Sequence, residues 1–507
     1  MMRLLRATAA ITAFAQIAWT QADPVIRDVR RYRQAHEHQI VRELMDLIAV
    51  PNVAGDAAAL RRNAELIAKQ LERRGLRARL LENDAAAPVV FGEQRTPGAT
   101  KTVVFYSHYD GSPVNAADWA SPPFTPVLRS GPIEKDGQPV AMPEPGKTFD
   151  PEWRLYGRSS ADAKAPIVAL LAALDALKAA GRSPAVNVKV VFEGEEEYGS
   201  KHLESTLARH KDLLQSDIWL VCDGPVHASR NAQIMFGARG IASLVLTVYG
   251  ARRELHSGHY GNWAPNPAFL LAQLLASMKD AEGKVLIEGF HEGVEPLGAA
   301  EKQALAELPA VEAELRKELA LGRTEGGGRA LAELITEPSL NVRAIASSSH
   351  VGEDTSNVIP SFAKAAIDMR LVKGVTAAQA ISRLKAHIVK QGYFIVDREP
   401  DAATLMAHPK VARFSEDHSY DAARTAMDLP IAQSVMRAAG RATERVLKLP
   451  TMGGSLPLVF IERPLNARTI VLPIVNHDNR QHSTNENLRL QNLWDGIELM
   501  AAMLTMQ

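Results

Sequence analysis

Two periods of hydrophobic residues alternate along most of the chain. Helical spacing predicts helices over residues 39–48 and 58–74, and an Ala- and Leu-rich stretch predicts another over 165–180. Short apolar runs rich in β-branched and aromatic residues predict strands, at 102–107, 186–192, 217–222 and 469–474. Helices interleaved with such strands favour an α/β fold, with a mixed, mostly parallel sheet sandwiched by helices.

The middle of the chain has a different pattern. Strands predicted at 241–249, 363–371 and 393–397 accompany helices predicted at 266–278 and 376–390. We expect these elements to form a compact α+β unit inserted into the larger domain. Between them, residues 298–321 are predicted to be helical and the three glycines at 326–328 to form a loop. The pattern assigns no role to this connecting segment.

The length of 507 residues agrees with more than one domain, because a single hydrophobic core seldom supports so long a chain. We therefore predict four segments: a leader at 1–22, the first part of a main domain at 23–236, an inserted domain at 237–408 and the second part of the main domain at 409–507.

The first residues have the features of a signal peptide. Arg3 and Arg6 precede an apolar stretch over 7–19, and residues 20–22 form a small-x-small cleavage pattern. The stretch is shorter than the roughly 20 residues that a membrane-spanning helix needs, and it lacks the clean alternation of a buried amphipathic helix. The sequence therefore predicts export, to the periplasm or out of the cell.

Charge and cysteine content narrow the choice of partners and compartment. The 58 basic and 58 acidic side chains balance, so nothing favours nucleic acid or an anionic membrane as a partner. Cys222 is the only cysteine, so no internal disulfide can form. Its position in an apolar run is typical of a small buried residue, not of a catalytic thiol.

Histidine and aspartate side chains stand where the predicted strands end. His108 and Asp110 directly follow the first predicted strand, Asp223 follows the third, and Asp162 precedes an Ala- and Leu-rich helix. The carboxyl ends of parallel strands meet at one edge of a sheet, so these side chains are expected to converge there. Taken singly, each also has an ordinary explanation as a surface turn or a helix cap.

An acidic cluster and a late polar loop add further candidates. Four glutamates stand among residues 193–197, after a predicted buried strand, where such a cluster requires cations or raised pKa values. Residues 476–483 form a polar loop after the last predicted strand. It contains His477 and His482, and the pattern alone does not decide which of them is a metal ligand.

The order of these features resembles the M20 family of metallopeptidases, and its carnosinase-like dipeptidase branch most closely. The motifs are HxD after a strand, GRxxxD before a helix, EGEEEYGS, an Asp at a strand end, Glu254-Leu255-His256-Ser257-Gly258, and Gly453-Gly454-Ser455-Leu456-Pro457 followed by a histidine. They cover most of the chain in the family's order. The resemblance implies a di-zinc exopeptidase-like fold whose inserted domain serves as lid and dimerisation domain.

The resemblance also implies a role for each matching residue around the metals. Asp162 would bridge two divalent metal ions, and Glu196 would act as general base and acid. Asp110 would contact the metal ligands without binding a metal itself. His108 and Asp223 would bind one ion, and Glu197 and His482 the other. The implied ligands are His108, Asp162, Glu197, Asp223 and His482.

Further positions match the family's substrate contacts. Arg370 corresponds to the arginine that clamps a substrate carboxylate, and Asn357, Gly454 and Ser455 correspond to other contacts. His256 would reach the active site of the neighbouring subunit in a homodimer and help to polarise the scissile carbonyl.

Carboxylate and imidazole ligands without a thiolate suit Zn²⁺, with Mn²⁺ or Co²⁺ as replacements. Two such ions about 3.5–4 Å apart can activate a shared water and polarise a carbonyl oxygen. The predicted activity is hydrolysis of a peptide amide bond in short peptides with a free C-terminal carboxylate.

Two other functions stay open. One is an N-acyl amino-acid amidohydrolase. The other is a non-catalytic periplasmic peptide- or metal-binding protein, against which Glu196 argues, because a binding protein needs no general base.

The segment around Asp162 departs from the family pattern. It usually has the form GRGxxD followed by an acid or amide and then Lys-Gly, whereas this chain has Ser159, Ala163 and Ala165-Pro166. Asp162 and Lys164 keep their places, so metal binding is expected to survive. The peptide bond after the bridging Asp is cis in the family, so Ala163 would have to accept a cis bond.

Overall fold

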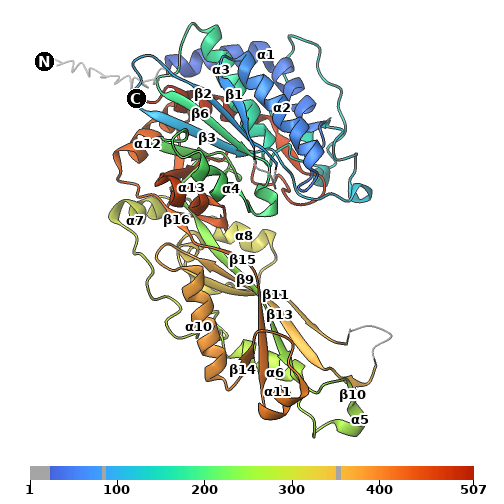
Figure 1. Cartoon of the computed structure of the whole chain (residues 1–507). Helices are drawn as coiled ribbons and strands as arrows, with labels where there is room; N and C mark the ends of the chain where they lie inside the picture. Colours follow the sequence, from blue (N-terminus) through green and yellow to red (C-terminus); the bar gives the residue numbers. More distant parts are fainter. Residues whose placement is uncertain (1–22, 83–86, 350–355) are drawn as a thin grey trace, which may run out of the picture.

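The computed structural model describes residues 23–82, 87–349 and 356–507, so the leader predicted at 1–22 lies outside the described residues. The described chain forms two lobes, one around an eight-stranded sheet and the other around a seven-stranded sheet (Figure 1). The first lobe combines the early and late parts of the chain, and the second contains the middle.

The sheet of the first lobe has the strand order β1-β2-β6-β3-β7-β19-β8-β17. Its centre is parallel, because β3 pairs with β6 and β7, and β7 pairs with β19, all in the same direction. Antiparallel pairs at β1-β2, β2-β6 and β19-β8 make the sheet mixed, as predicted. The strands are β1 (Arg77–Leu81), β2 (Val89–Gln94), β3 (Thr102–His108), β6 (Asn187–Glu193), β7 (Ile218–Val221), β8 (Ala232–Met235), β17 (Val446–Leu449) and β19 (Thr469–Val471).

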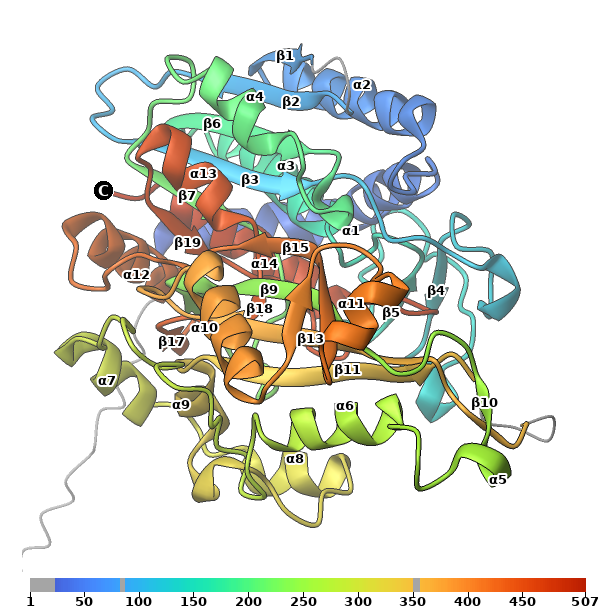
Figure 2. The same cartoon turned by 60° about the horizontal axis from the view of Figure 1, so that its bottom comes forward.

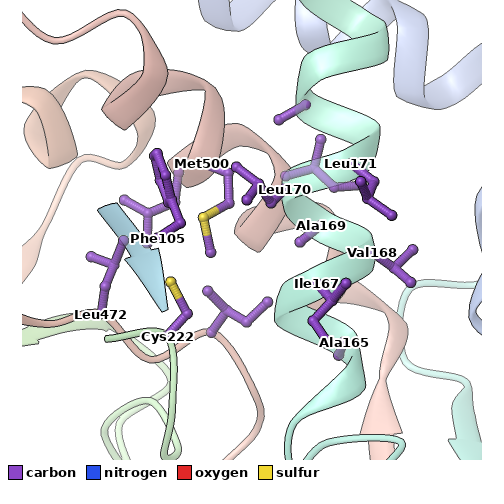
Figure 3. Close-up of a cluster of buried hydrophobic side chains, with 14 of the residues drawn as sticks. Phe105, Ala165, Ile167, Val168, Ala169, Leu170, Leu171, Cys222, Leu472 and Met500 are labelled. Carbon is purple, nitrogen blue, oxygen red and sulfur yellow. The ribbon is translucent and has the colours of Figure 1, made fainter. Parts of the chain in front are cut away.

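Both faces of this sheet are buried in hydrophobic clusters, and successive residues of each strand point to opposite faces. On β3, Phe105 faces one hydrophobic cluster and Tyr106 the other. Figure 3 shows Phe105 and Cys222 beside the apolar side chains of α3, so Cys222 is the small buried residue that the sequence predicts. The helices of the first face are α1 (Pro24–Ile48), α2 (Ala57–Arg73), α3 (Lys164–Ala179), α12 (Pro430–Ala442) and α14 (Leu490–Leu504), and those of the second are α4 (Leu203–Arg209) and α13 (Leu458–Leu465).

Helix α3 is buried on almost every side, which explains a sequence rich in Ala and Leu with little amphipathic alternation. It packs between α1 and α14. Lys164 in its first turn is fully buried and donates hydrogen bonds to the carbonyl oxygens of Leu47 and Val50, at 2.8 and 3.0 Å. These bonds tie the start of α3, close to Asp162, to the end of α1.

The second lobe is an α+β unit, as predicted for the insert. The main path of its sheet is β11-β13-β9-β15-β14, and α6 (Pro267–Ala276) and α10 (Ala377–Lys390) pack on one face. Its strands are β9 (Gly237–Tyr249), β11 (Ser339–Ser347), β13 (Phe362–Leu371), β14 (Phe394–Val396) and β15 (Val411–Tyr420). A two-stranded pair, β10 (Leu255–His256) with β12 (Val358–Ile359), lies with α5 (Ser257–Tyr260) at the end of the lobe away from the first lobe (Figure 1).

The chain passes between the lobes along two adjacent strands. It leaves the first lobe along β9 and returns along β15 and β16 (Ala423–Arg424), both of which pair with β9. Gly237 and Gly240 permit this close approach, because a Cβ on either would overlap backbone atoms of the returning strand. β15 carries the second sheet to Tyr420, beyond the limit predicted for the insert at residue 408.

The connecting segment of unassigned role joins the two lobes a second time. Its helices are α7 (Ala299–Ala306), α8 (Glu312–Glu318) and α9 (Leu331–Ile335), and the three glycines form a 3₁₀ turn before α9. α7 packs against β17, and α9 packs against β18 (Met452–Ser455), both of which follow the return to the first lobe (Figure 2). Among the described helices, none combines the length and hydrophobicity that crossing a bilayer requires.

Candidate metal centre

The carboxyl ends of β3 and β7 bring His108 and Asp223 together with Asp162. His108 is the last residue of β3 and is fully buried. Its Nε2 lies 3.0 Å from Asp162 Oδ1 and 3.8 Å from Asp223 Oδ2. The three side chains offer ligand atoms that all lie within 4.8 Å of one another.

A second group of three shares Asp162 with the first. His482 Nε2 lies 3.1 Å from Asp162 Oδ2 and 3.2 Å from Glu197 Oε2. These ligand atoms also lie within 4.8 Å of one another. Asp162 therefore turns one oxygen toward each group. His477 is exposed and belongs to neither group among the described residues, so the structure distinguishes the two histidines that the sequence left equal.

The loop before Asp162 adopts an uncommon backbone conformation. The Asp162–Ala163 peptide bond is cis, as the family resemblance implies. Ser159, which stands where the family has glycine, has a φ of 62°, in the left-handed region that favours glycine. Asn52 Nδ2 donates to Ser159 Oγ at 2.9 Å and to the Tyr109 carbonyl oxygen at 2.7 Å, which helps to hold this conformation.

The acidic motif forms a 3₁₀ turn, η3 (Glu196–Tyr198), shortly after the end of β6. The backbone N–H groups of Glu196 and Glu197 donate to the carboxylate of Asp110, at 3.2 and 3.0 Å. Asp110 Oδ1 also lies 3.3 Å from His108 Nδ1. Asp110 thus contacts both the imidazole and the acidic turn without joining either ligand group, a position that orients its neighbours.

Burial and crowding resist ionisation of most of these carboxylates. Burial, with the neighbouring carboxylates, raises the pKa of Glu196 well above its usual value, that of Glu197 to about 7 and that of Asp223 to about 6. Burial also acts to raise the pKa of Asp162, but hydrogen bonds from His108 and His482 outweigh it and lower that pKa. The hydrogen bond with Asp162 raises the pKa of His482 to about 9.

The second lobe brings an arginine toward this edge. Arg370 on β13 donates from Nη1 to Ser455 Oγ at 2.8 Å, and its Nε lies 3.2 Å from Asp368 Oδ1. Arg239 is buried nearby, and burial followed by the charge of Arg370 lowers its pKa to about 10. Of these two guanidinium groups only Arg370 forms an ion pair with a carboxylate among the described residues, so this place favours a further anion. Gly454 adjoins Ser455 on β18 and is exposed.

His256 and Asn357 lie together but apart from the metal residues of the same chain. Both are exposed at the far end of the second lobe, where the Ser257 N–H donates to the Asn357 carbonyl oxygen at 2.8 Å (Figure 1). The N–H of Gly258 donates to His256 Nδ1 at 3.1 Å, which leaves Nε2 as the free position of the ring. Within one chain, the structure does not bring these two residues to the predicted ligands.

Sequence reasoning missed several buried residues around the ligands. Ser112 donates from Oγ to Glu197 Oε2 at 2.7 Å, and Asn52 supports the Asp162 loop. Glu486 is fully buried and accepts hydrogen bonds from the same loop. No local pattern distinguishes these residues, although Glu486 stands shortly after His482 in the same polar loop.

The donor set fits two divalent cations. Two groups of imidazole and carboxylate ligands share one carboxylate, and no thiolate takes part. Two ligands on one tetrahedral zinc ion would lie ~3.3 Å apart, since each stands ~2.0–2.1 Å from the ion, and several of the distances above are of this order.

The family model for peptidase family M20/M25/M40 matches residues 104–506. The chain belongs to this family. This M20 chain is 26% identical to the human Beta-Ala-His dipeptidase, over 94% of this chain and 92% of that protein. It is 24% identical to a Cys-Gly metallodipeptidase of Schizosaccharomyces pombe, over 91% of this chain and 94% of that protein.

Solved structures share its fold. An M20 family metallo-carboxypeptidase from Sulfolobus solfataricus has a TM-score of 0.74 at 24% identity, covering 92% of this chain and 98% of that one. The crystal structure of human carnosine dipeptidase 1 has a TM-score of 0.72 at 22% identity, covering 95% and 98%. The solved structures confirm the predicted fold. The family model and the relatives confirm the predicted M20 resemblance and a metallopeptidase that uses divalent metal ions.

Metal binding to this M20 chain is expected to strengthen as the pH rises from about 6 to about 9. Glu197 and Asp223, with pKa values of about 7 and 6, must lose protons to act as ligands, and so must His482, with a pKa of about 9. Calorimetric titration with Zn²⁺ in buffers of different ionisation enthalpy should show proton release at pH 7. Zn²⁺ affinity that is constant over this range, with no proton release, would contradict the assigned ligands.

Proposed function

We propose that this chain is a dipeptidase or exopeptidase that hydrolyses short peptides with a free C-terminal carboxylate, using two divalent metal ions. One observation carries the proposal: Asp162 belongs to both three-residue ligand groups and turns one oxygen toward the other two members of each. The relatives named above include dipeptidases, which supports short peptides as the substrate class. Zn²⁺ is the proposed metal because the donors are imidazoles and carboxylates.

The residues around the ligands divide the chemistry between them. The bound cations would supply an activated water and polarise the scissile carbonyl. Glu196 would accept a proton from the attacking water and deliver it to the leaving amine. Its raised pKa suits this exchange, and its backbone is fixed by Asp110 at 3.2 Å. Arg370, held by Ser455, forms charge-assisted hydrogen bonds with the substrate carboxylate.

His256 completes the proposed site from a second copy of the chain. His256 is exposed and belongs to β10, which lies at the end of the second lobe away from the first lobe (Figure 1). Exposed Phe269 on α6 and Ile345 on β11 offer apolar surface on the same lobe for such a contact. The proposed homodimer places His256 of each subunit at the other subunit's carbonyl-binding position.

We also propose that the protein is exported to the periplasm or secreted. The support is the basic, apolar and small-residue pattern of residues 1–22.

The substitution Glu196→Gln is expected to lower kcat by about 10²–10⁴-fold, because the amide cannot carry the proton. Metal content should stay at the wild-type value, since Glu196 is in neither ligand group. The neighbouring substitution Glu195→Gln is the control, because Glu195 pairs with His202 instead. Dipeptide hydrolysis and elemental analysis measure the two effects. A Glu196→Gln enzyme with normal turnover would exclude this glutamate as the base, whereas a wild type that binds dipeptides without hydrolysing them would favour a binding protein.

The substitution Arg370→Met is expected to lower kcat/KM for a free dipeptide about 10- to 100-fold, since a charge-assisted hydrogen bond contributes ~1.5–3 kcal/mol. The same substitution should scarcely change the slow hydrolysis of the matching dipeptide amide. Arg343→Met on the exposed strand β11 serves as control. A panel that includes N-acyl amino acids separates the peptidase from the amidohydrolase alternative. Wild-type enzyme that prefers the amide over the acid would refute the clamp.

Mixing two inactive variants tests the exchange of His256 between subunits. His256→Ala and Glu196→Gln are each expected to be weakly active alone. In a mixed dimer, one site has Glu196 from the first variant and His256 from the second, so mixing should restore activity. Sedimentation measures the dimer itself. An active monomer, or a mixture no more active than its parts, would remove His256 from the site.

A further inference from the structure

One buried carboxylate holds the loop of the bridging ligand through backbone N–H groups, and it belongs to neither ligand group among the described residues. Glu486 has no exposed surface, and both of its oxygens accept hydrogen bonds from residues 158–162. We propose that Glu486 is a positioning residue, which fixes the Asp162 loop and so sets where the shared ligand stands. The inference rests on the metal site of the proposed function.

The four hydrogen bonds leave no free position on this carboxylate. Oε1 accepts from the backbone N–H groups of Ala161 and Asp162, both at 2.9 Å. Oε2 accepts from the backbone N–H of Ser159 at 2.9 Å and from Nη1 of Arg158 at 2.8 Å. Three backbone N–H groups of this loop are therefore held by one side chain, and Asp162 is the last residue that it holds.

Glu486 also ties this loop to the loop that carries His482. The Gly157 N–H donates to the Glu486 carbonyl oxygen at 3.1 Å, and β20 (Asn487–Arg489) then pairs with β5 (Arg154–Tyr156). Arg158 Nη2 reaches back to the Ser483 carbonyl oxygen at 3.1 Å. The segments that supply Asp162 and His482 are thus joined on both sides of Glu486.

The charge of Glu486 matters as well as its shape. Arg158 neutralises it inside the protein, and the Arg158 guanidinium also stacks over Trp119 at 5.1 Å. A glutamine would keep the volume but would turn an NH₂ group toward two donors on one side. The backbone there includes Ser159, whose positive φ requires an external constraint. Loss of one acceptor oxygen, and so of two hydrogen bonds, is expected to release this part of the loop.

The test compares Zn²⁺ binding and folding in the full-length protein. Chelator-treated wild type, Glu486→Gln and Glu462→Gln are titrated with Zn²⁺ by calorimetry, and their thermal unfolding without added metal is recorded. Glu462 is a suitable control because it is a partly buried acid of the same lobe that accepts from Thr469 at the opposite end of β19. Glu486→Gln should bind Zn²⁺ about 10- to 100-fold more weakly, as expected when a group behind a ligand is lost. Glu462→Gln should match wild type.

The outcomes separate the inference from the proposed function. A Glu486→Gln protein with lower thermal stability but wild-type Zn²⁺ affinity would overturn the positioning role. A wild type that binds no Zn²⁺ would overturn the proposed function and this inference with it. Should Glu486→Gln fail to fold, Glu486→Asp keeps the charge on a shorter side chain and must also show weakened Zn²⁺ binding; unchanged affinity would again overturn the proposal.

Discussion

The repulsion among buried carboxylates at one edge of the central sheet is the constraint on which the rest of this structure depends. Asp162, Glu196, Glu197 and Asp223 crowd an environment where ionisation is unfavourable, and only the imidazoles of the same site offset it from within the ligand set. Such an arrangement requires raised pKa values or bound cations, together with rigid elements that keep the groups in place. The parallel strands, the buried helix α3 and the hydrogen bonds behind the ligands provide that rigidity, and cations complete it.

A layered support follows from this constraint. Asp110 holds the acidic turn from one side, Glu486 holds the Asp162 loop from another, and Lys164 fixes the helix that follows. Each of these side chains is buried and ionisable, so each is costly to bury unless its partners are in place. The interactions that set the geometry of the five ligands are therefore also interactions that stabilise the fold around Asp162.

The sequence was sufficient for the elements that end in ligands. β3, β6 and β7 are short apolar runs followed by conspicuous polar residues, and α3 is long and uniformly apolar, so both their type and their chemistry are visible locally. The strands β1, β11 and β15 escaped prediction because they contain charged or exposed residues and owe their conformation to pairing with a neighbour. Glu486 was missed for a related reason: its partners are backbone groups more than three hundred positions away.

The paired strands that join the lobes give the second lobe the mechanics of a lever arm. Arg370 lies opposite Ile241, close to the pivot, whereas His256 follows the far end of β9. A given small tilt about the junction displaces a point in proportion to its radius from it. A small tilt of the second lobe would therefore move Arg370 little relative to the metal ligands and would move His256 much further.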